Sequence, residues 1–94
     1  MKREYVYMIG SEHDLCHPVK IGVTRDIEKR LSQINTGNHE QLNVKATIGP
    51  LDQKAAYALE DSIHAKLHSY HIRGEWFTSS CKPAFVLAAE YTCG

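Results

Sequence analysis

The chain has 94 residues, which is enough for one small domain and too few for two. Eleven Lys and Arg balance eleven Asp and Glu, so the net charge does not attract an anionic polymer, and any contact with nucleic acid must come from a local patch. No stretch approaches the roughly 20 apolar residues of a membrane span, and the first residues lead into strand-like sequence rather than a signal-peptide core. These features predict a cytoplasmic protein with no membrane partner.

The N-terminal part of the chain predicts two paired strands. Residues 5–9 are aromatic, β-branched and apolar and precede a glycine, which is typical of a buried strand. Residues 19–23 alternate between apolar side chains and Lys20 or Gly22, which predicts a second short strand. Since a polar connection joins the two, we expect an antiparallel hairpin with a long loop.

A helix and a third strand are expected next. The helix is predicted over residues 27–36, because Asp26 can cap its first turn and Gly37 can end it in the left-handed conformation. Residues 43–48 then alternate between polar and apolar side chains, which predicts the strand. Gly49-Pro50 is expected to end it.

A second helix is predicted after Asp52, which is another N-cap candidate. Glu60, His64 and His68 follow one another at steps of four residues, so we expect them to stack along one face of this helix. A neighbouring face carries an apolar stripe that can pack on the sheet. The stripe consists of Ala56, Leu59, Ile63 and Leu67.

The C-terminal part of the chain predicts a turn and a last helix. Residues 74–77, Gly-Glu-Trp-Phe, are typical of a turn into a short packed segment, and Pro83 fits the first turn of a helix over about residues 82–91. The order of elements offers few β-α-β connections for a parallel sheet. We therefore expect one α+β domain over residues 1–94, with a small antiparallel sheet covered by helices.

Four side chains are suited to the hydrolysis of a phosphodiester bond. Glu60 can hold a Mg²⁺ ion, which commonly keeps most of its waters, and Arg30 can contact phosphate oxygens through two nitrogens. Tyr7 can act as general base if a nearby cation lowers its pKa from about 10, and Lys20 is a candidate for that cation. Each residue alone also has an ordinary interpretation, as strand packing or solvated charge.

The spacing of these residues allows them to meet. Tyr5 and Tyr7 share one face of the first strand, and Lys20 and Gly22 share one face of the second. The four groups converge if the helices that carry Arg30 and Glu60 cover that same face. The sequence alone does not decide which face this is.

Six short motifs in this order resemble the GIY-YIG nuclease superfamily, and within it the phage T5 Orf172-like and Mug113-like branch. The resemblance covers about residues 5–77, and it rests on the order of the motifs rather than on any one of them. The motifs are Tyr5-Val6-Tyr7-Met8-Ile9, Val19-Lys20-Ile21-Gly22, Glu28-Lys29-Arg30-Leu31, Gly37-Asn38, Leu59-Glu60-x-x-Ile63-His64 and Gly74-Glu75-Trp76-Phe77.

The resemblance implies a three-stranded antiparallel sheet flanked by helices and a DNA endonuclease that uses one Mg²⁺ or Mn²⁺ ion. Tyr7 matches the tyrosine that helps to activate the attacking water, and Arg30 matches the arginine that contacts the phosphate. Glu60 matches the metal-binding glutamate, and His64, one turn further, is expected to support the site. Gly22 matches a glycine that allows close approach.

The chain departs from the superfamily pattern at three positions. Tyr5 stands where the first motif has glycine, and it is expected to serve packing alone. Lys20 stands where the second motif usually has tyrosine, although the branch commonly has lysine there. No asparagine follows Asn43, whereas many members of the superfamily have one downstream.

Contacts with DNA are expected from a few polar residues despite the balanced net charge. Trp76 and Phe77 could stack on a base, although core packing is the more common use of such residues in a small domain. A separate protein partner is expected to supply targeting, because no residues remain for a recognition domain. The candidates for DNA contact are Arg25, Lys29, Asn38, Lys45 and Arg73.

Two other functions remain open from the sequence. One is a catalytically inactive DNA-binding or protein-interaction module on the same fold. The other is a structural zinc domain, because His64 and His68 at one-turn spacing can chelate Zn²⁺, although the glutamate that a zinc-protease helix needs is missing. A second group, His13, Cys16 and His17, is interpreted as a coincidence in a surface loop.

Overall fold

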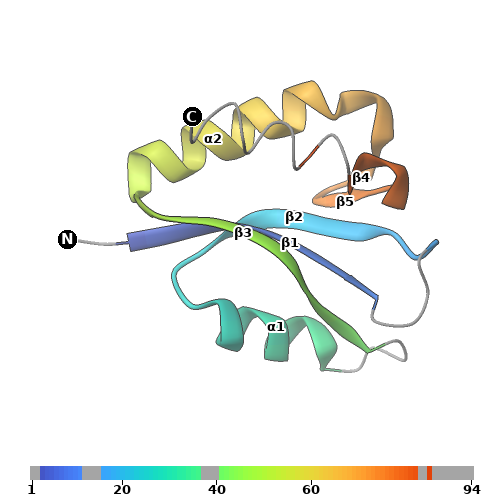
Figure 1. Cartoon of the computed structure of the whole chain (residues 1–94), viewed down its shortest axis with the longest axis horizontal. Helices are drawn as coiled ribbons and strands as arrows, with labels where there is room; N and C mark the ends of the chain where they lie inside the picture. The colour runs from blue at the N-terminus through green and yellow to red at the C-terminus, as the bar shows by residue number, and fades with distance from the viewer. Residues whose placement is uncertain (1–2, 12–15, 37–40, 83–84, 86–94) are drawn as a thin grey trace.

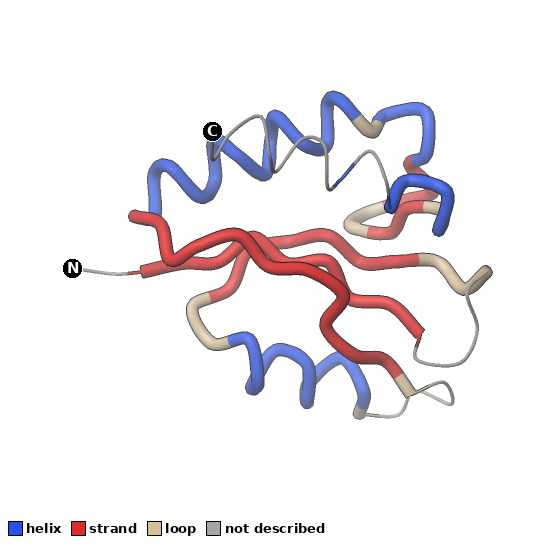
Figure 2. Tube along the Cα trace, viewed as in Figure 1, coloured by secondary structure: helices blue, strands red, loops and turns tan. Residues whose placement is uncertain are grey.

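The computed structural model describes residues 3–11, 16–36, 41–82 and 85. Within them, an antiparallel five-stranded sheet has the order β3-β1-β2-β5-β4. Helix α1 covers one face of the sheet and α2 the other (Figures 1 and 2). The elements are β1 Arg3–Ser11, β2 Val19–Thr24, α1 Ile27–Asn35, β3 Leu42–Asp52, α2 Gln53–Lys66, β4 His71–Arg73 and β5 Trp76–Phe77, with short 3₁₀ turns η1 His68–Tyr70 and η2 Ser79–Cys81.

The prediction of an α+β fold with an antiparallel sheet is confirmed, but the prediction of three strands is wrong. The additional strands, β4 and β5, form a hairpin that extends the sheet, with Lys20 opposite Trp76 and Val19 opposite Phe77. Every residue of β4 is exposed and β5 has only two residues. No alternation of polar and apolar residues was therefore available to predict them.

Strand β3 continues through Gly49-Pro50 to Asp52, so the predicted end at this dipeptide is wrong. Proline has no backbone N–H group, so it cannot donate a hydrogen bond to a neighbouring strand. An interior strand pairs on both sides, but β3 lies at the edge of the sheet and, among the described strands, pairs only with β1. Its register with β1 shifts between Glu4 and Val6, close to the dipeptide. An edge position with an irregular ladder tolerates proline.

Both predicted helix caps are confirmed. The Asp26 carboxylate accepts a hydrogen bond from the Lys29 backbone N–H at 3.0 Å, and the Asp52 carboxylate accepts one from the Ala55 N–H at 2.9 Å. Helix α1 ends one residue earlier than predicted, which lies within the normal variation of helix ends. Among the described residues, no helix is long and apolar enough to cross a membrane.

Helix α2 ends at Lys66, so the predicted stack of Glu60, His64 and His68 along one helix is wrong at its last member. His68 begins the turn η1 and is exposed. The prediction of a zinc site depended on both histidines lying one turn apart on the same helix. The structural basis for a zinc site on this helix is therefore lost.

The core has two layers, one on each face of the sheet. The larger layer lies under α2, whose predicted apolar stripe is buried there together with Phe77 and Phe85. The smaller layer lies under α1 and contains Tyr7, Ile9 and Leu42. Apart from Lys82 and Phe85, the predicted C-terminal helix lies outside the described residues.

The helices that carry Arg30 and Glu60 cover opposite faces of the sheet, so these two residues do not approach Tyr7 from the same side.

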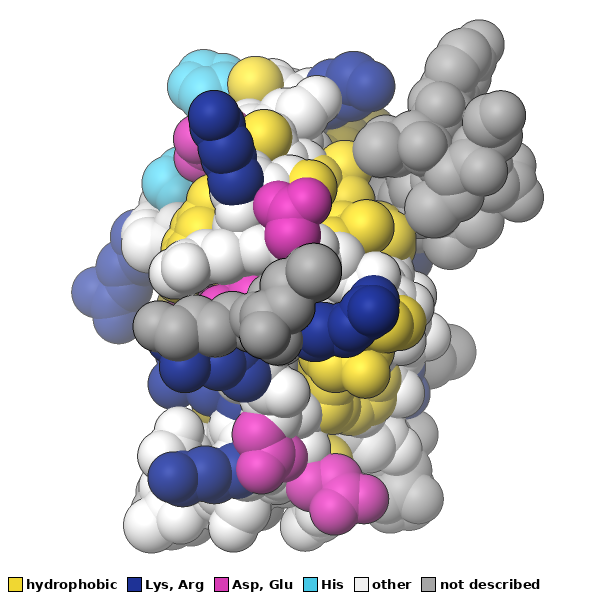
Figure 3. Space-filling view, turned by 90° about the vertical axis from the view of Figure 1, so that its left-hand side faces the viewer, with side chains coloured by type: hydrophobic (Ala, Val, Ile, Leu, Met, Phe, Trp, Pro, Cys, Tyr) yellow, Lys and Arg dark blue, Asp and Glu magenta, His cyan; other side chains and the backbone are white. Residues whose placement is uncertain are grey.

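Charged residues of both signs are mixed on one face of the molecule. On the face that lies at the N-terminal end of β1, Lys and Arg side chains alternate with Asp and Glu (Figure 3). A field of one sign is absent from the described residues of this face, which agrees with the balanced composition.

Candidate active site

Tyr7 forms the centre of a polar cluster inside the sheet. It lies on β1 opposite Gly22 of β2 and is fully buried. Its hydroxyl accepts a hydrogen bond from Arg30 Nε at 3.1 Å and donates one to Glu75 Oε1 at 3.3 Å. Burial raises the pKa of Tyr7 above 10, although the Arg30 hydrogen bond opposes the rise. The tyrosine is therefore neutral and is held between a cation and an anion.

Gly22 provides the space in which this cluster forms. A Cβ atom at this position would lie 2.6 Å from the Tyr7 hydroxyl oxygen and 2.8 Å from Glu75 Oε1. Both distances are shorter than van der Waals contact, and both atoms belong to the cluster itself. The absence of a side chain at Gly22 thus allows the phenol and the carboxylate to meet, as the resemblance implied.

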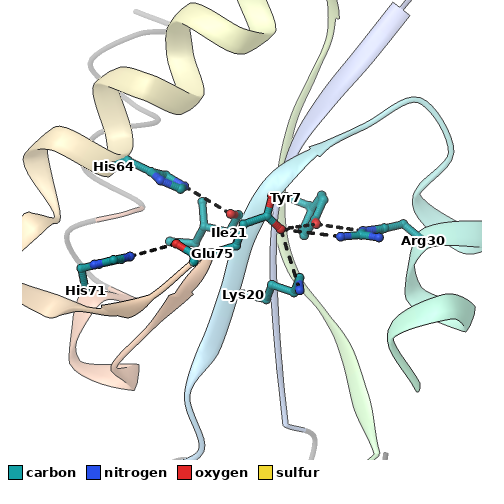
Figure 4. Close-up of polar contacts among 8 residues, drawn as sticks. Tyr7, Lys20, Ile21, Arg30, His64, His71 and Glu75 are labelled. Atoms are coloured by element: carbon teal, nitrogen blue, oxygen red, sulfur yellow. Dashed lines mark hydrogen bonds and ion pairs between the residues drawn. The ribbon is translucent and has the colours of Figure 1, made fainter. Parts of the chain in front are cut away.

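Glu75 joins the other charged groups together (Figure 4). Its Oε1 atom lies 3.7 Å from Arg30 Nη2 and 3.9 Å from Lys20 Nζ. The residue lies in the turn between β4 and β5, and its backbone carbonyl accepts a hydrogen bond from the Ile21 N–H at 2.9 Å. This bond fixes the turn against β2, so the carboxylate is positioned by the backbone as well as by its partners.

Glu75 was not predicted as a site residue, although residues 74–77 form one of the six motifs that carry the resemblance. One signal could have identified it. Lys20 and Arg30 were both predicted at the site, while Glu60 was its only predicted anion. Two partly buried cations beside a buried phenol require a further negative charge nearby.

Lys20 differs from its predicted role. It was expected to lower the pKa of Tyr7, but the pKa of Tyr7 is raised and the cation at its hydroxyl is Arg30. The hydrogen bond that Arg30 donates to the Tyr7 hydroxyl in turn raises the pKa of Arg30. Lys20 instead pairs with Glu75 and lies over the Trp76 ring, with Nζ 5.3 Å from the ring centroid. The described side-chain contacts of Lys20 are therefore with Glu75 and Trp76, and Glu75 in turn contacts Tyr7.

Glu60 and His64 lie on α2, across the sheet from α1. The His64 Nε2 donates a hydrogen bond to the Ile21 carbonyl at 3.2 Å (Figure 4). The His64 ring packs edge-on against Phe77, with 4.9 Å between the ring centroids. His64 is thus anchored on the same β2 residue that holds the Glu75 turn. No contact within the described residues joins Glu60 directly to Tyr7, Lys20 or Arg30.

Electrostatics nevertheless link Glu60 to the cluster. Burial raises the pKa of Glu60, His64 opposes the rise, and the negative charges of Glu75 and Asp61 add to it. Among the residues that the structure describes, none donates a hydrogen bond to this carboxylate. A half-buried carboxylate without a donor, in the field of a second carboxylate, is a position where a cation is favourable.

This electrostatic strain predicts that Glu60→Gln stabilises the domain at neutral pH in the absence of divalent ions. The folded-state pKa of Glu60 lies above its unfolded value. The contribution of Glu60 to the free energy of unfolding is therefore fully present below about pH 4.3 and is lost as the pH rises through the folded-state pKa. Thermal unfolding in EDTA should show a higher Tm for Glu60→Gln at pH 7 and a smaller difference near pH 4. The exposed neighbour supplies the control, because Asp61→Asn should change Tm less. A lower Tm for Glu60→Gln at pH 7 would contradict the assignment.

The described residues that were predicted to contact DNA are not part of the Tyr7 cluster, and their surroundings differ from one another. Arg25 Nε is 3.1 Å from Oε1 of the buried Glu4, so this arginine compensates a buried charge. Lys29, Lys45 and Arg73 are exposed. Asn38 lies outside the described residues, as does His13 of the loop group. His17 donates from Nδ1 to the Pro18 carbonyl at 2.8 Å and packs edge-on against Trp76.

A site for a single Mg²⁺ or Mn²⁺ ion remains compatible with these side chains. Within the described ranges, no three His, Cys, Asp or Glu side chains are grouped to hold a metal ion. Mg²⁺ commonly binds through one or two carboxylates, several waters and the phosphates of a substrate. Glu60 is the carboxylate that fits this description, because it lacks a hydrogen-bond donor and lies in the negative field of Glu75.

Comparison with known proteins gives one match. The T5orf172 domain family matches residues 4–89, which covers β1, β2, both helices and the β4–β5 hairpin. No curated protein and no solved structure matches the chain. The chain therefore belongs to the T5orf172 domain family, a GIY-YIG-like nuclease family.

Proposed function

We propose that this domain is a GIY-YIG-type DNA endonuclease that depends on a single Mg²⁺ or Mn²⁺ ion. One observation carries the proposal, namely the meeting of Tyr7, Arg30 and Glu75 over Gly22. A phenol between a guanidinium and a carboxylate offers a phosphate clamp and a path for a proton in one place. Membership of a nuclease family supports the same conclusion.

Arg30 would bind the scissile phosphate. Its Nε is engaged by Tyr7, while its Nη2 makes only a long contact of 3.7 Å with Glu75. The terminal nitrogens therefore retain N–H groups for phosphate oxygens. Since burial and the Tyr7 bond fix the side chain, little ordering is needed when charge develops on the phosphate.

Tyr7 would act as a proton relay. Because the pKa of Tyr7 is raised, its hydroxyl is not ionised before the reaction. The neutral phenol can therefore accept a proton only while it donates its own. As the water oxygen bonds to phosphorus, its proton moves to the Tyr7 oxygen, and the phenolic proton moves to Glu75 along the existing 3.3 Å hydrogen bond. The phosphorus bond to the leaving oxygen breaks, and that oxygen takes a proton from solvent.

Glu60 would hold the divalent ion, and His64 would keep the adjoining part of β2 in place. When bound, the ion supplies positive charge that stabilises the leaving oxygen. Lys20 would hold the Glu75 carboxylate in position together with Arg30, since both cations lie near Oε1. Its role is one of positioning, since its contacts are with Glu75 and Trp76 rather than with Tyr7.

The proposal predicts that wild-type protein nicks supercoiled plasmid with Mg²⁺ or Mn²⁺ and does not in EDTA. Glu75→Gln should lower the nicking rate about 100-fold, because the amide cannot accept the relayed proton at its nitrogen and carries no charge. Binding of DNA should strengthen in the same variant, since a negative charge beside Lys20 and Arg30 is removed. A merely structural role for Glu75 would not separate binding from rate in this way.

Glu28→Gln is the matched control, because Glu28 is an exposed carboxylate on α1. It should change neither the nicking rate nor DNA binding strongly. Folded wild type that cuts neither supercoiled nor single-stranded DNA with either ion would overturn the proposal and favour a non-catalytic module on the same fold.

A further inference from the structure

A pocket of about 350 Å³ lies beside the Tyr7 cluster. It forms where the β4–β5 hairpin meets the residues that precede β2, and its volume is in the usual range for a small-ligand site. None of the roles proposed above uses this pocket. Its lining consists of His17, Pro18, Ile72, Arg73 and Trp76.

The lining combines a flat aromatic surface with one cation. Trp76 is half-buried and packs against the layer that contains Tyr7, so its ring is held in place. Ile72 is 48% exposed, one of two large hydrophobic side chains so exposed in the described parts of the chain. Arg73 adds a positive charge at the rim. Exposed apolar surface beside a cation suits a ligand with a flat ring and an attached phosphate.

His17 adds a hydrogen-bonding group to the lining. Its Nδ1 donates to the Pro18 carbonyl, which leaves Nε2 of the neutral ring as an acceptor. An acceptor next to an indole face can engage an exocyclic amino group or a ring N–H of a nucleobase. The pocket thus offers both stacking and an in-plane hydrogen bond.

Lys20 connects the pocket to the Tyr7 cluster. It is the direct cross-strand partner of Trp76, so both side chains project from the same face of the sheet. Its Nζ lies over the Trp76 ring and also within 3.9 Å of Glu75. A chain of nucleotides with one phosphate at Arg30 would therefore pass Lys20 and reach the pocket with a neighbouring base.

We infer that this pocket binds one unstacked nucleobase next to the scissile phosphate, so that the preferred substrate is DNA with an unpaired nucleotide. The inference rests on the proposed nuclease function. In a duplex both faces of a base are covered by its neighbours, and the base must leave the stack before it can lie against Trp76. Single-stranded DNA meets no such cost, because its bases are already free to stack on an aromatic ring.

Intrinsic fluorescence tests this inference without any substitution, because Trp76 is the only tryptophan of the chain. Titration of the full-length wild type in EDTA with a short oligothymidine should quench the indole emission in a saturable way. A duplex of the same length should quench it much less at equal occupancy. Equal quenching by both, or binding of the oligothymidine without quenching, would overturn the inference.

Variants test the same pocket by binding of the fluorescein-labelled oligothymidine. Trp76→Ala should weaken this binding about 10-fold, with Trp76→Phe close to wild type and duplex affinity changed little. Ile72→Glu should also weaken it, and this exposed position carries little risk to folding. Tyr57→Ala is the control, because Tyr57 is equally exposed, at 47%, but lies on α2. Unchanged binding in both pocket variants would overturn the inference.

The two proposals fail separately. If the protein cuts DNA but Trp76→Ala and Ile72→Glu leave its preference for single strands unchanged, the pocket assignment is wrong and the nuclease remains. If the quenching and the variant effects appear in a protein that never cuts, the pocket binds a base and the nuclease proposal is wrong.

Discussion

Arg30→Ala is expected to lower the rate of metal-dependent DNA cleavage by about 10³-fold or more, the range found when an arginine that stabilises phosphoryl charge is removed. Arg30 both reaches the phosphate and holds the Tyr7 hydroxyl, so alanine removes two interactions at once. Arg30→Lys should not restore the rate, because an ammonium cannot keep the bond to Tyr7 and present two further N–H groups in one plane. Initial rates of plasmid nicking at saturating Mg²⁺ measure the effect.

Lys29→Ala is the matched control for Arg30. Lys29 is the preceding residue on α1 and is exposed, and its backbone N–H, which binds the Asp26 cap, is retained in alanine. Its nicking rate should remain close to wild type. Circular dichroism and thermal unfolding should show that Arg30→Ala still folds, since Tyr7 keeps its hydrogen bond to Glu75. An Arg30→Ala protein as active as Lys29→Ala would exclude a phosphate clamp at this position.

Glu60→Gln is expected to reduce cleavage by about 10³-fold, which corresponds to a loss of roughly 4 kcal/mol of stabilisation of the reacting charges. The amide lacks the negative charge that would retain the divalent ion. The same substitution should abolish the rise in Tm that Mg²⁺ or Mn²⁺ gives to the wild type, because a ligand that binds the folded state stabilises it. Nicking rates and thermal unfolding with and without the ion measure both effects.

Asp61→Asn distinguishes loss of a ligand from a general loss of negative charge. Asp61 is the exposed neighbour of Glu60 and raises its pKa through space. Its substitution should leave both cleavage and the stabilisation by metal largely intact. If the metal still raises the Tm of Glu60→Gln as much as that of the wild type, the ion binds elsewhere.

The parts of the fold that depend on local chemistry were predictable from the sequence. Asp26 and Asp52 cap helices because short carboxylates satisfy free N–H groups of the first turn, whatever lies around them. The pairing of residues 5–9 with residues 20–24 follows from two short predicted strands joined by one loop. Of the expected convergence of four groups, the structure shows the approach of Arg30 to Tyr7, whereas Glu60 lies on a helix across the sheet.

The parts that depend on tertiary structure were not predictable. Nothing in the pattern of α2 indicates which face of the sheet it covers, so the position of Glu60 across the sheet from α1 could not be inferred. The hairpin of β4 and β5 is held by pairing with β2 rather than by its own composition. The role of Glu75 follows from that pairing, because the residue is an ordinary turn glutamate until the Ile21 N–H fixes it beside Tyr7.

The bond between Tyr7 and Glu75 joins positions that are 68 residues apart. During synthesis, Tyr7, Lys20 and Arg30 leave the ribosome well before the hairpin that carries Glu75. A nascent or truncated chain that ends before this hairpin lacks the relay carboxylate, the indole of Trp76 and a partner for the outer edge of β2. Any cutting activity would therefore require a chain that already includes this hairpin.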